Sequence, residues 1–92
     1  MDEHDIRHNE ARRRFELEAG EGTAILTYER EDVIVTFTHT IVPEKMEGRG
    51  IGGRLVRTGL DWARAEGLKV VPRCPFVAAW IERHPDYRDL VA

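Results

Sequence analysis

The first half of the chain alternates hydrophobic and polar residues with the period of two that is typical of half-buried strands. The alternation predicts strands over residues 14–19, 23–30 and 33–42, joined by short turns. Short connections favour an antiparallel meander. Residues 1–11 show no apolar period, and we expect a frayed lead-in there. The faces expected to point inward carry Phe15, Leu17 and Ala19, then Ala24, Leu26 and Tyr28, then Val33, Val35, Phe37, His39 and Ile41.

From residue 51 the apolar period changes to that of an amphipathic helix of four to five turns. Gly67 suits the position just after its end, and residues 68–74 read as a short fourth strand. Cys74 and Pro75 then suit the start of a second helix that Pro85 ends. The predicted order is βββαβα, an α+β fold in which a right-handed crossover makes strands three and four parallel. The apolar helix positions are Ile51, Leu55, Val56, Gly59, Leu60, Trp62 and Ala63.

Length and charge narrow the class of protein. Ninety-two residues predict a single domain spanning 1–92. A net charge of −3 argues against a nucleic-acid partner. One cysteine rules out an internal disulfide and fits a reducing compartment. No apolar run approaches the ~20 residues of a membrane span, and no secretion signal is seen. We therefore expect a cytoplasmic protein without a membrane partner. No His, Cys and Asp cluster has ligand spacing, so we expect no metal.

A glycine cluster, EGRGIGGR at residues 47–54, follows the third predicted strand and opens the first helix. This place argues against a flexible tether. Helix N-termini carry unpaired N–H groups and a favourable dipole for anions, so the loop reads as a phosphate cradle. The Walker pattern fails because Arg54 and Leu55 follow Gly53. A dinucleotide pattern fits in spacing from Gly48 to Gly53. It also requires an acidic residue at the end of the next strand, where this chain has Arg73 and Cys74 instead. A loop without a ligand stays open as well.

The cluster resembles motif A of the GNAT superfamily of N-acetyltransferases, Arg/Gln-x-x-Gly-x-Gly/Ala. Gly50 and Gly52 fill the glycine places, and Glu47 stands where Arg or Gln is usual. The segments RHN, FELE, THTIVPEKMEGRGIGGRLV and VVPRCPFVAAWIERHPDY make residues 7–91 similar to the small Yjdj-type branch, also called N-acetyltransferase domain-containing. The resemblance implies a minimal GNAT fold that binds the pyrophosphate of acetyl-CoA. It implies contacts from Glu47, Gly48, Arg49, Gly50, Ile51, Gly52, Gly53 and Arg54, and main-chain pairing of Ile41 and Val42 with the pantetheine arm.

Two residues are the main candidates for chemistry. Cys74 lies at a predicted helix start beside Arg73, where a thiol pKa falls, although most free cysteines are small buried hydrophobes. His39 is a candidate general base or a satisfied histidine at a sheet edge. The resemblance places both near the thioester. Weaker candidates for the pocket or its acceptor side are His84, Tyr87, His8 and Asn9, whereas Trp62 and Trp80 read as packing residues.

Two functions remain open from the sequence. The first is transfer of an acetyl group from acetyl-CoA to an amine, in a small molecule or a protein, with Cys74 as general acid or transient acyl carrier. The second is a non-catalytic acyl-CoA-binding or interaction module. This second function is favoured because the chain lacks the two helices that GNAT domains usually carry after the first strand.

Overall fold

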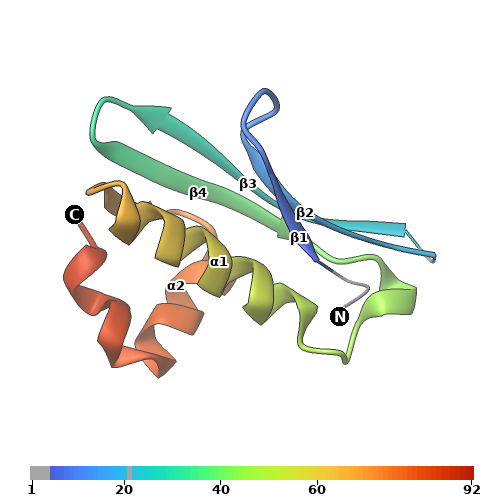
Figure 1. Ribbon diagram of the computed structural model, residues 1–92. Helices are drawn as coiled ribbons and strands as arrows, with labels where there is room; N and C mark the ends of the chain where they lie inside the picture. The colour runs from blue at the N-terminus through green and yellow to red at the C-terminus, as the bar shows by residue number, and fades with distance from the viewer. Residues whose placement is uncertain (1–4, 21) are drawn as a thin grey trace.

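A computed structural model describes residues 5–20 and 22–92. The chain forms a curved sheet with the two main helices beneath one face (Figure 1). A 3-10 helix, η1, precedes the first helix, and another, η2, follows the second. In chain order the elements are β1 (Ile6–Asn9), β2 (Arg14–Ala19), β3 (Gly22–Glu31), β4 (Ile34–Ile41), η1 (Glu44–Met46), α1 (Ile51–Ala65), β5 (Lys69–Pro72), α2 (Pro75–Arg83) and η2 (Pro85–Leu90).

The five strands lie in the order β1-β2-β3-β4-β5. The first four are antiparallel, and β5 runs parallel to β4, which confirms the predicted α+β fold and its crossover through α1. The expected frayed lead-in is wrong over β1, because Ile6 pairs with Leu17 and Asn9 with Arg14. Backbone pairing at the sheet edge needs little apolar alternation, so the pattern gave no signal. Residues 1–4 of that lead-in lie outside the described residues.

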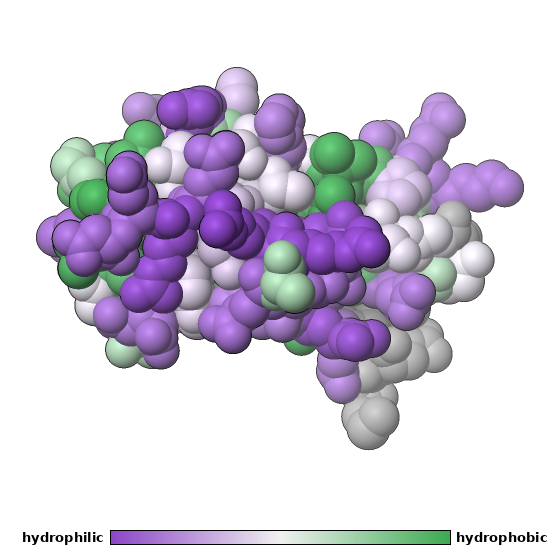
Figure 2. Space-filling view, turned by 90° about the horizontal axis from the view of Figure 1, so that it is seen from above, coloured by the Kyte–Doolittle hydropathy of each residue, from purple (hydrophilic) through white to green (hydrophobic). Residues whose placement is uncertain are grey.

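The core lies between the sheet and the helices. The predicted inward residues of β2 and β3 are buried, Ala19 at the end of β2 only in part. Gly59 lets α1 approach the sheet closely: a Cβ there would lie 3.0 Å from both Leu26 Cδ2 and Phe37 Cε1. Among the described residues, no helix covers the opposite face of the sheet (Figure 1). Seen from that side, the surface is mainly hydrophilic with separate hydrophobic areas (Figure 2).

The helix ends follow the sequence signals. At the end of α1, Gly67 has φ 71° and its N–H bonds to the Arg64 carbonyl, while the Leu68 N–H bonds to Ala63. This pair of bonds is the Schellman arrangement, which favours glycine at the left-handed position. Cys74 is the N-cap of α2 and Pro75 its first residue, as predicted. The end of α1 therefore sets where β5 begins, and the start of α2 sets the position of Cys74 just after β5.

A bulge in β4 changes which residues face the helices. Tyr28 pairs with Phe37, but Thr27 pairs with His39, so Thr38 is one extra residue on β4. Because side chains alternate with a period of two, an extra residue reverses the faces beyond it. The prediction that His39 and Ile41 share the face of Phe37 is therefore wrong. Val33, which was expected on the same face, is also exposed. His39 is exposed on the outer face, and Thr40, paired with Leu26, points to the helix side.

Candidate functional site

A groove opens where β4 and β5 part. Within the described chain, the last pair of the two strands joins Phe37 and Pro72. The Cys74 N–H then donates to the Phe37 carbonyl at 2.9 Å, after which β5 turns into α2. The space beyond is a groove of about 550 Å³, which the end of β4, η1 and the starts of α1 and α2 enclose. Its wall consists of Thr40, Ile41, Val42, Met46, Glu47, Gly48, Gly50, Ile51, Gly52, Gly53 and Phe76.

The N-terminus of α1 forms one end of the groove. Gly50 is its N-cap with φ 72°, a left-handed conformation that favours glycine, and it has no side chain with which to cap the helix. The Arg54 N–H bonds back to the Gly50 carbonyl at 3.1 Å. The amides of Ile51, Gly52 and Gly53 precede that bond, as the first amides of any helix do. The first turn carries no acidic residue, although Glu47 lies on the wall of the same groove. The dipole of the helix favours an anion at this end.

Apolar side chains line much of the remaining wall. Phe76 in the first turn of α2 is 42% exposed, and Ile41 at the end of β4 is 53% exposed. The Phe76 ring lies over Gly52, where a Cβ would come within 2.9 Å of Cζ. Met46 is fully buried at the base. The groove therefore combines an apolar stretch with a polar helix end, a mixture that suits an elongated ligand with an anionic group.

Cys74 lies behind this wall and is only 4% exposed. Its Sγ is 3.4 Å from Thr40 Oγ1. Burial is the strongest influence on the Cys74 thiol and opposes ionisation. Hydrogen bonds from the Thr40 side chain and from the main chain of Val77, Phe76 and Thr40 favour the thiolate, and the pKa of Cys74 is lowered overall. These favourable groups are neutral, and the expected partner Arg73 is exposed. The start of α2 and the Thr40 hydroxyl therefore both favour the thiolate form of Cys74.

The groove brings together most of the residues expected to contact a ligand. Ile41, Val42, Glu47, Gly48, Gly50, Ile51, Gly52 and Gly53 lie on its wall. The other predicted contacts, Arg49 and Arg54, do not line it, and neither does His39. Sequence reasoning missed Thr40, Met46 and Phe76. Thr40 lies within the family-like segment 38–56, but nothing in the apolar pattern marks the bulge that turns Thr40 inward.

Comparison with known proteins shows which family the chain belongs to. Residues 14–90 match the family described as GCN5-related N-acetyl-transferase. The chain belongs to this family. Protein NATD1 of Gallus gallus and of Homo sapiens are each 32% identical over 83 residues. Those matches cover 87% of this chain, 76% of the Gallus gallus protein and 74% of the human one.

The structural comparison extends over the whole fold. The solution structure of a GCN5-like protein from Staphylococcus aureus superposes with a TM-score of 0.78 at 25% identity. That match covers 100% of this chain and 91% of the other. The family and the fold together support acetyl transfer as the general chemistry. They also show that this minimal arrangement of strands and helices is a GNAT fold.

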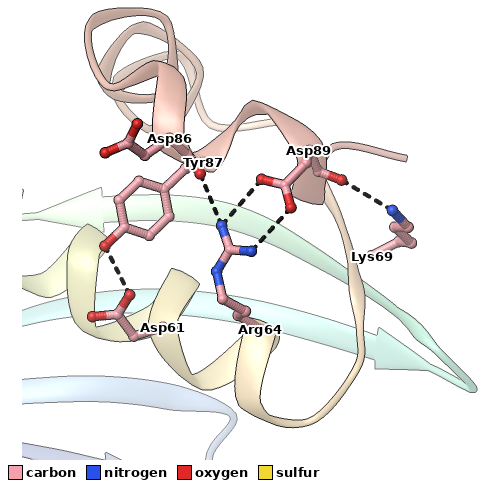
Figure 3. Close-up of polar contacts among 6 residues, drawn as sticks. All are labelled: Asp61, Arg64, Lys69, Asp86, Tyr87 and Asp89. Atoms are coloured by element: carbon pink, nitrogen blue, oxygen red, sulfur yellow. Dashed lines mark hydrogen bonds and ion pairs between the residues drawn. The ribbon is translucent and has the colours of Figure 1, made fainter.

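The C-terminal candidates of this GNAT domain lie in a packing network away from the groove wall. The Tyr87 hydroxyl donates to Asp61 of α1 at 2.8 Å, and Arg64 of α1 binds both carboxylate oxygens of Asp89 (Figure 3). His84 stacks on Trp80 with 3.7 Å between ring centroids. The C-terminal segment, residues 84–90, thus links α2 to α1 through these contacts. This arrangement favours the packing interpretation of His84 and Tyr87 over a pocket role.

The N-terminal candidates also lie apart from the groove wall. His8 stacks on Phe15 at 4.1 Å between centroids, and its Nε2 is 2.6 Å from the Tyr28 hydroxyl. Asn9 donates to Glu16 at 3.0 Å. Burial is the main influence on His8 and lowers its pKa. Both residues therefore join β1 to the meander, which is a structural role.

Across residues 5–20 and 22–92, no three His, Cys, Asp or Glu side chains come together in a way that would hold a metal ion. Among the helices in the same residues, none has the length and apolar character needed to cross a membrane.

Proposed function

We propose that this protein binds acetyl-CoA in the groove between β4, α1 and α2 and transfers the acetyl group to an amine. The observation that carries the proposal is the groove itself, which opens where β4 and β5 part and ends on the N-terminus of a 15-residue helix. Its apolar wall suits the pantetheine arm, and its helix end suits the pyrophosphate. Membership of the family supports this chemistry.

The pyrophosphate would lie against the first amides of α1. Glycine at positions 50, 52 and 53 keeps side chains away from those N–H groups, so phosphate oxygens can approach the backbone. The pantetheine arm would pair with the main chain of Ile41 and Val42, which lie on the groove wall beyond the last β5 partner. Both parts of the ligand are then held mainly by backbone, which explains how Glu47 can replace the usual Arg or Gln.

Cys74 is the proposed centre for proton handling. Acetyl-CoA supplies an activated acetyl thioester. The Cys74 thiol would give its proton to the departing CoA sulfur, or would carry the acetyl group before the amine accepts it. The lowered pKa of Cys74 favours either role. Because Cys74 is only 4% exposed, the wall between it and the groove must open for the thiol to take part.

His39 keeps a narrower role in the proposal. Its exposed side chain lies on the outer sheet face, whereas Thr40 faces Cys74. His39 would therefore act as a base only for an acceptor that approaches from the open face of the sheet. Water or the acceptor itself would otherwise release the amine proton.

Thiol release from acetyl-CoA in the presence of a panel of small amines and lysine peptides tests this function. Turnover that exceeds the protein-free rate and falls with Cys74→Ala supports the proposal. A matched titration calorimetry experiment measures CoA binding. Binding without turnover for every acceptor would favour the non-catalytic acyl-CoA-binding module, and the absence of binding would refute the proposed groove.

A further inference from the structure

The contact between Thr40 and Cys74 exists only because of the bulge at Thr38. Without the extra residue, the alternation of β4 would place residue 40 on the outer face with Thr36. The bulge reverses this, and Thr40 Oγ1 comes to 3.4 Å from Cys74 Sγ, 34 residues later in the chain. Thr40 also lies on the groove wall, whereas Cys74 lies behind it. Thr40 is therefore in contact with both the groove and the thiol.

We propose that Thr40 is the positioning residue for Cys74, and that its hydroxyl donates a hydrogen bond to the sulfur when the thiol ionises. This inference rests on the proposed function, in which Cys74 handles the proton or the acetyl group. In the resting thiol either atom can be the donor. A thiolate is only an acceptor, so the Thr40 hydroxyl must then donate. The bond fixes the sulfur next to the groove wall.

Few groups around Cys74 stabilise its ionised sulfur. The main chain of Phe76 and Val77 at the start of α2 stabilises the thiolate, and the remaining favourable contacts come from Thr40 itself. These groups carry no formal charge, and Arg73 is exposed. The α2 amides come with any helix start. The Thr40 hydroxyl is the side-chain contribution, and it can be removed without changing the backbone.

Thr40→Val tests the inference, because valine keeps the shape and β-branching but has no hydroxyl. Thr40→Ser keeps the hydroxyl. Thr38→Val is the matched control: its hydroxyl bonds to Thr27 at 2.6 Å on the outer face, away from Cys74. Each variant is treated with iodoacetamide across a range of pH, and Cys74 is the only cysteine in the sequence, so alkylation reports this site alone. Circular dichroism and thermal unfolding confirm that each variant is folded.

Thr40→Val should raise the midpoint of the alkylation profile by about one pH unit and slow alkylation at neutral pH by roughly tenfold. Thr40→Ser should restore the wild-type midpoint, and Thr38→Val should leave it unchanged. An unchanged midpoint in folded Thr40→Val would overturn the inference. So would an equal shift in Thr38→Val.

The assay separates this inference from the proposed function because alkylation needs no acetyl-CoA. If Thr40→Val shifts the alkylation midpoint but the protein never releases thiol from acetyl-CoA, the role of Thr40 is supported and the transferase function is refuted. Turnover by the wild type, with an unshifted Thr40→Val midpoint, would keep the transferase and refute the contact. Where turnover is measurable, Thr40→Val should lower kcat, and Thr40→Ser should recover it.

Discussion

Gly52→Ala separates the ligand-binding role of the glycine loop from its contribution to stability. A Cβ at this position would lie 2.9 Å from Phe76 Cζ and 3.1 Å from Cε2, against 3.4 Å for the start of ordinary contact. The ring must therefore move by about 0.5 Å. Because Phe76 is 42% exposed, it can make this movement cheaply. Replacing a helical glycine with alanine gains up to about 1 kcal/mol, so the variant should unfold at the wild-type temperature or slightly above it.

Binding should change in the opposite direction. The new methyl group and the displaced ring both occupy the groove beside the first amides of α1, where the pyrophosphate is proposed to lie. We expect the Kd for CoA to rise by at least tenfold, about 1.4 kcal/mol. Titration calorimetry measures the affinity, and thermal unfolding of the same samples measures stability.

Phe76→Ala, alone and combined with Gly52→Ala, identifies the cause of the loss. The combined variant has no ring to displace but still carries the methyl group beside the amides. Its affinity should stay below that of Phe76→Ala alone if phosphate oxygens approach the backbone at Gly52. Wild-type CoA affinity in a folded Gly52→Ala protein would refute the placement of the pyrophosphate.

Three further predictions concern the core, the pH dependence and the outer face. Gly59→Ala should destabilise the fold by about 1–2 kcal/mol in urea unfolding, since its Cβ would lie 3.0 Å from buried Leu26 and Phe37. Burial lowers the pKa of His8, so the unfolded chain takes up a proton first as pH falls below about 6.5. Unfolding free energy should therefore fall on acidification through that range, and His8→Phe should flatten this dependence. His39→Ala should leave CoA affinity and the Cys74 alkylation midpoint unchanged; a shift in either would show that His39 reaches the groove.

The sequence predicted the elements that bury a continuous apolar face. In β2 and β3 the period of two is unbroken, and the buried residues Phe15, Leu17 and Leu26 follow it. In α1 the helical period, the glycines before it and Gly67 after it all agree, so both ends were placed within a residue or so. Cys74 at the start of α2 was also predictable, because Pro75 fits only the first turn.

β1 was missed for a physical reason. Its residues pack at the edge through a ring contact and polar bonds, with Ile6 as its only aliphatic residue. Strand pairing of this kind is made by the backbone, which a hydropathy pattern does not record. The same limit applies to the groove wall, because Met46 and Phe76 come together there from segments 30 residues apart.

The bulge at Thr38 shows how one extra residue changes which side chains face the groove. Val35 and Phe37 alternate correctly, and the apolar pattern continues through Ile41 as if no residue were added. Only pairing with β3 reveals the reversal, since Thr27 faces His39 and Leu26 faces Thr40. A ligand on the helix side of the groove therefore meets a hydroxyl next to a thiol. An acceptor that arrives over the open outer face meets the imidazole of His39 instead. Thr40 and His39 lie on opposite faces of β4, so their contributions can be measured separately. Alkylation of the thiol reports on Thr40, and transfer to an acceptor reports on His39.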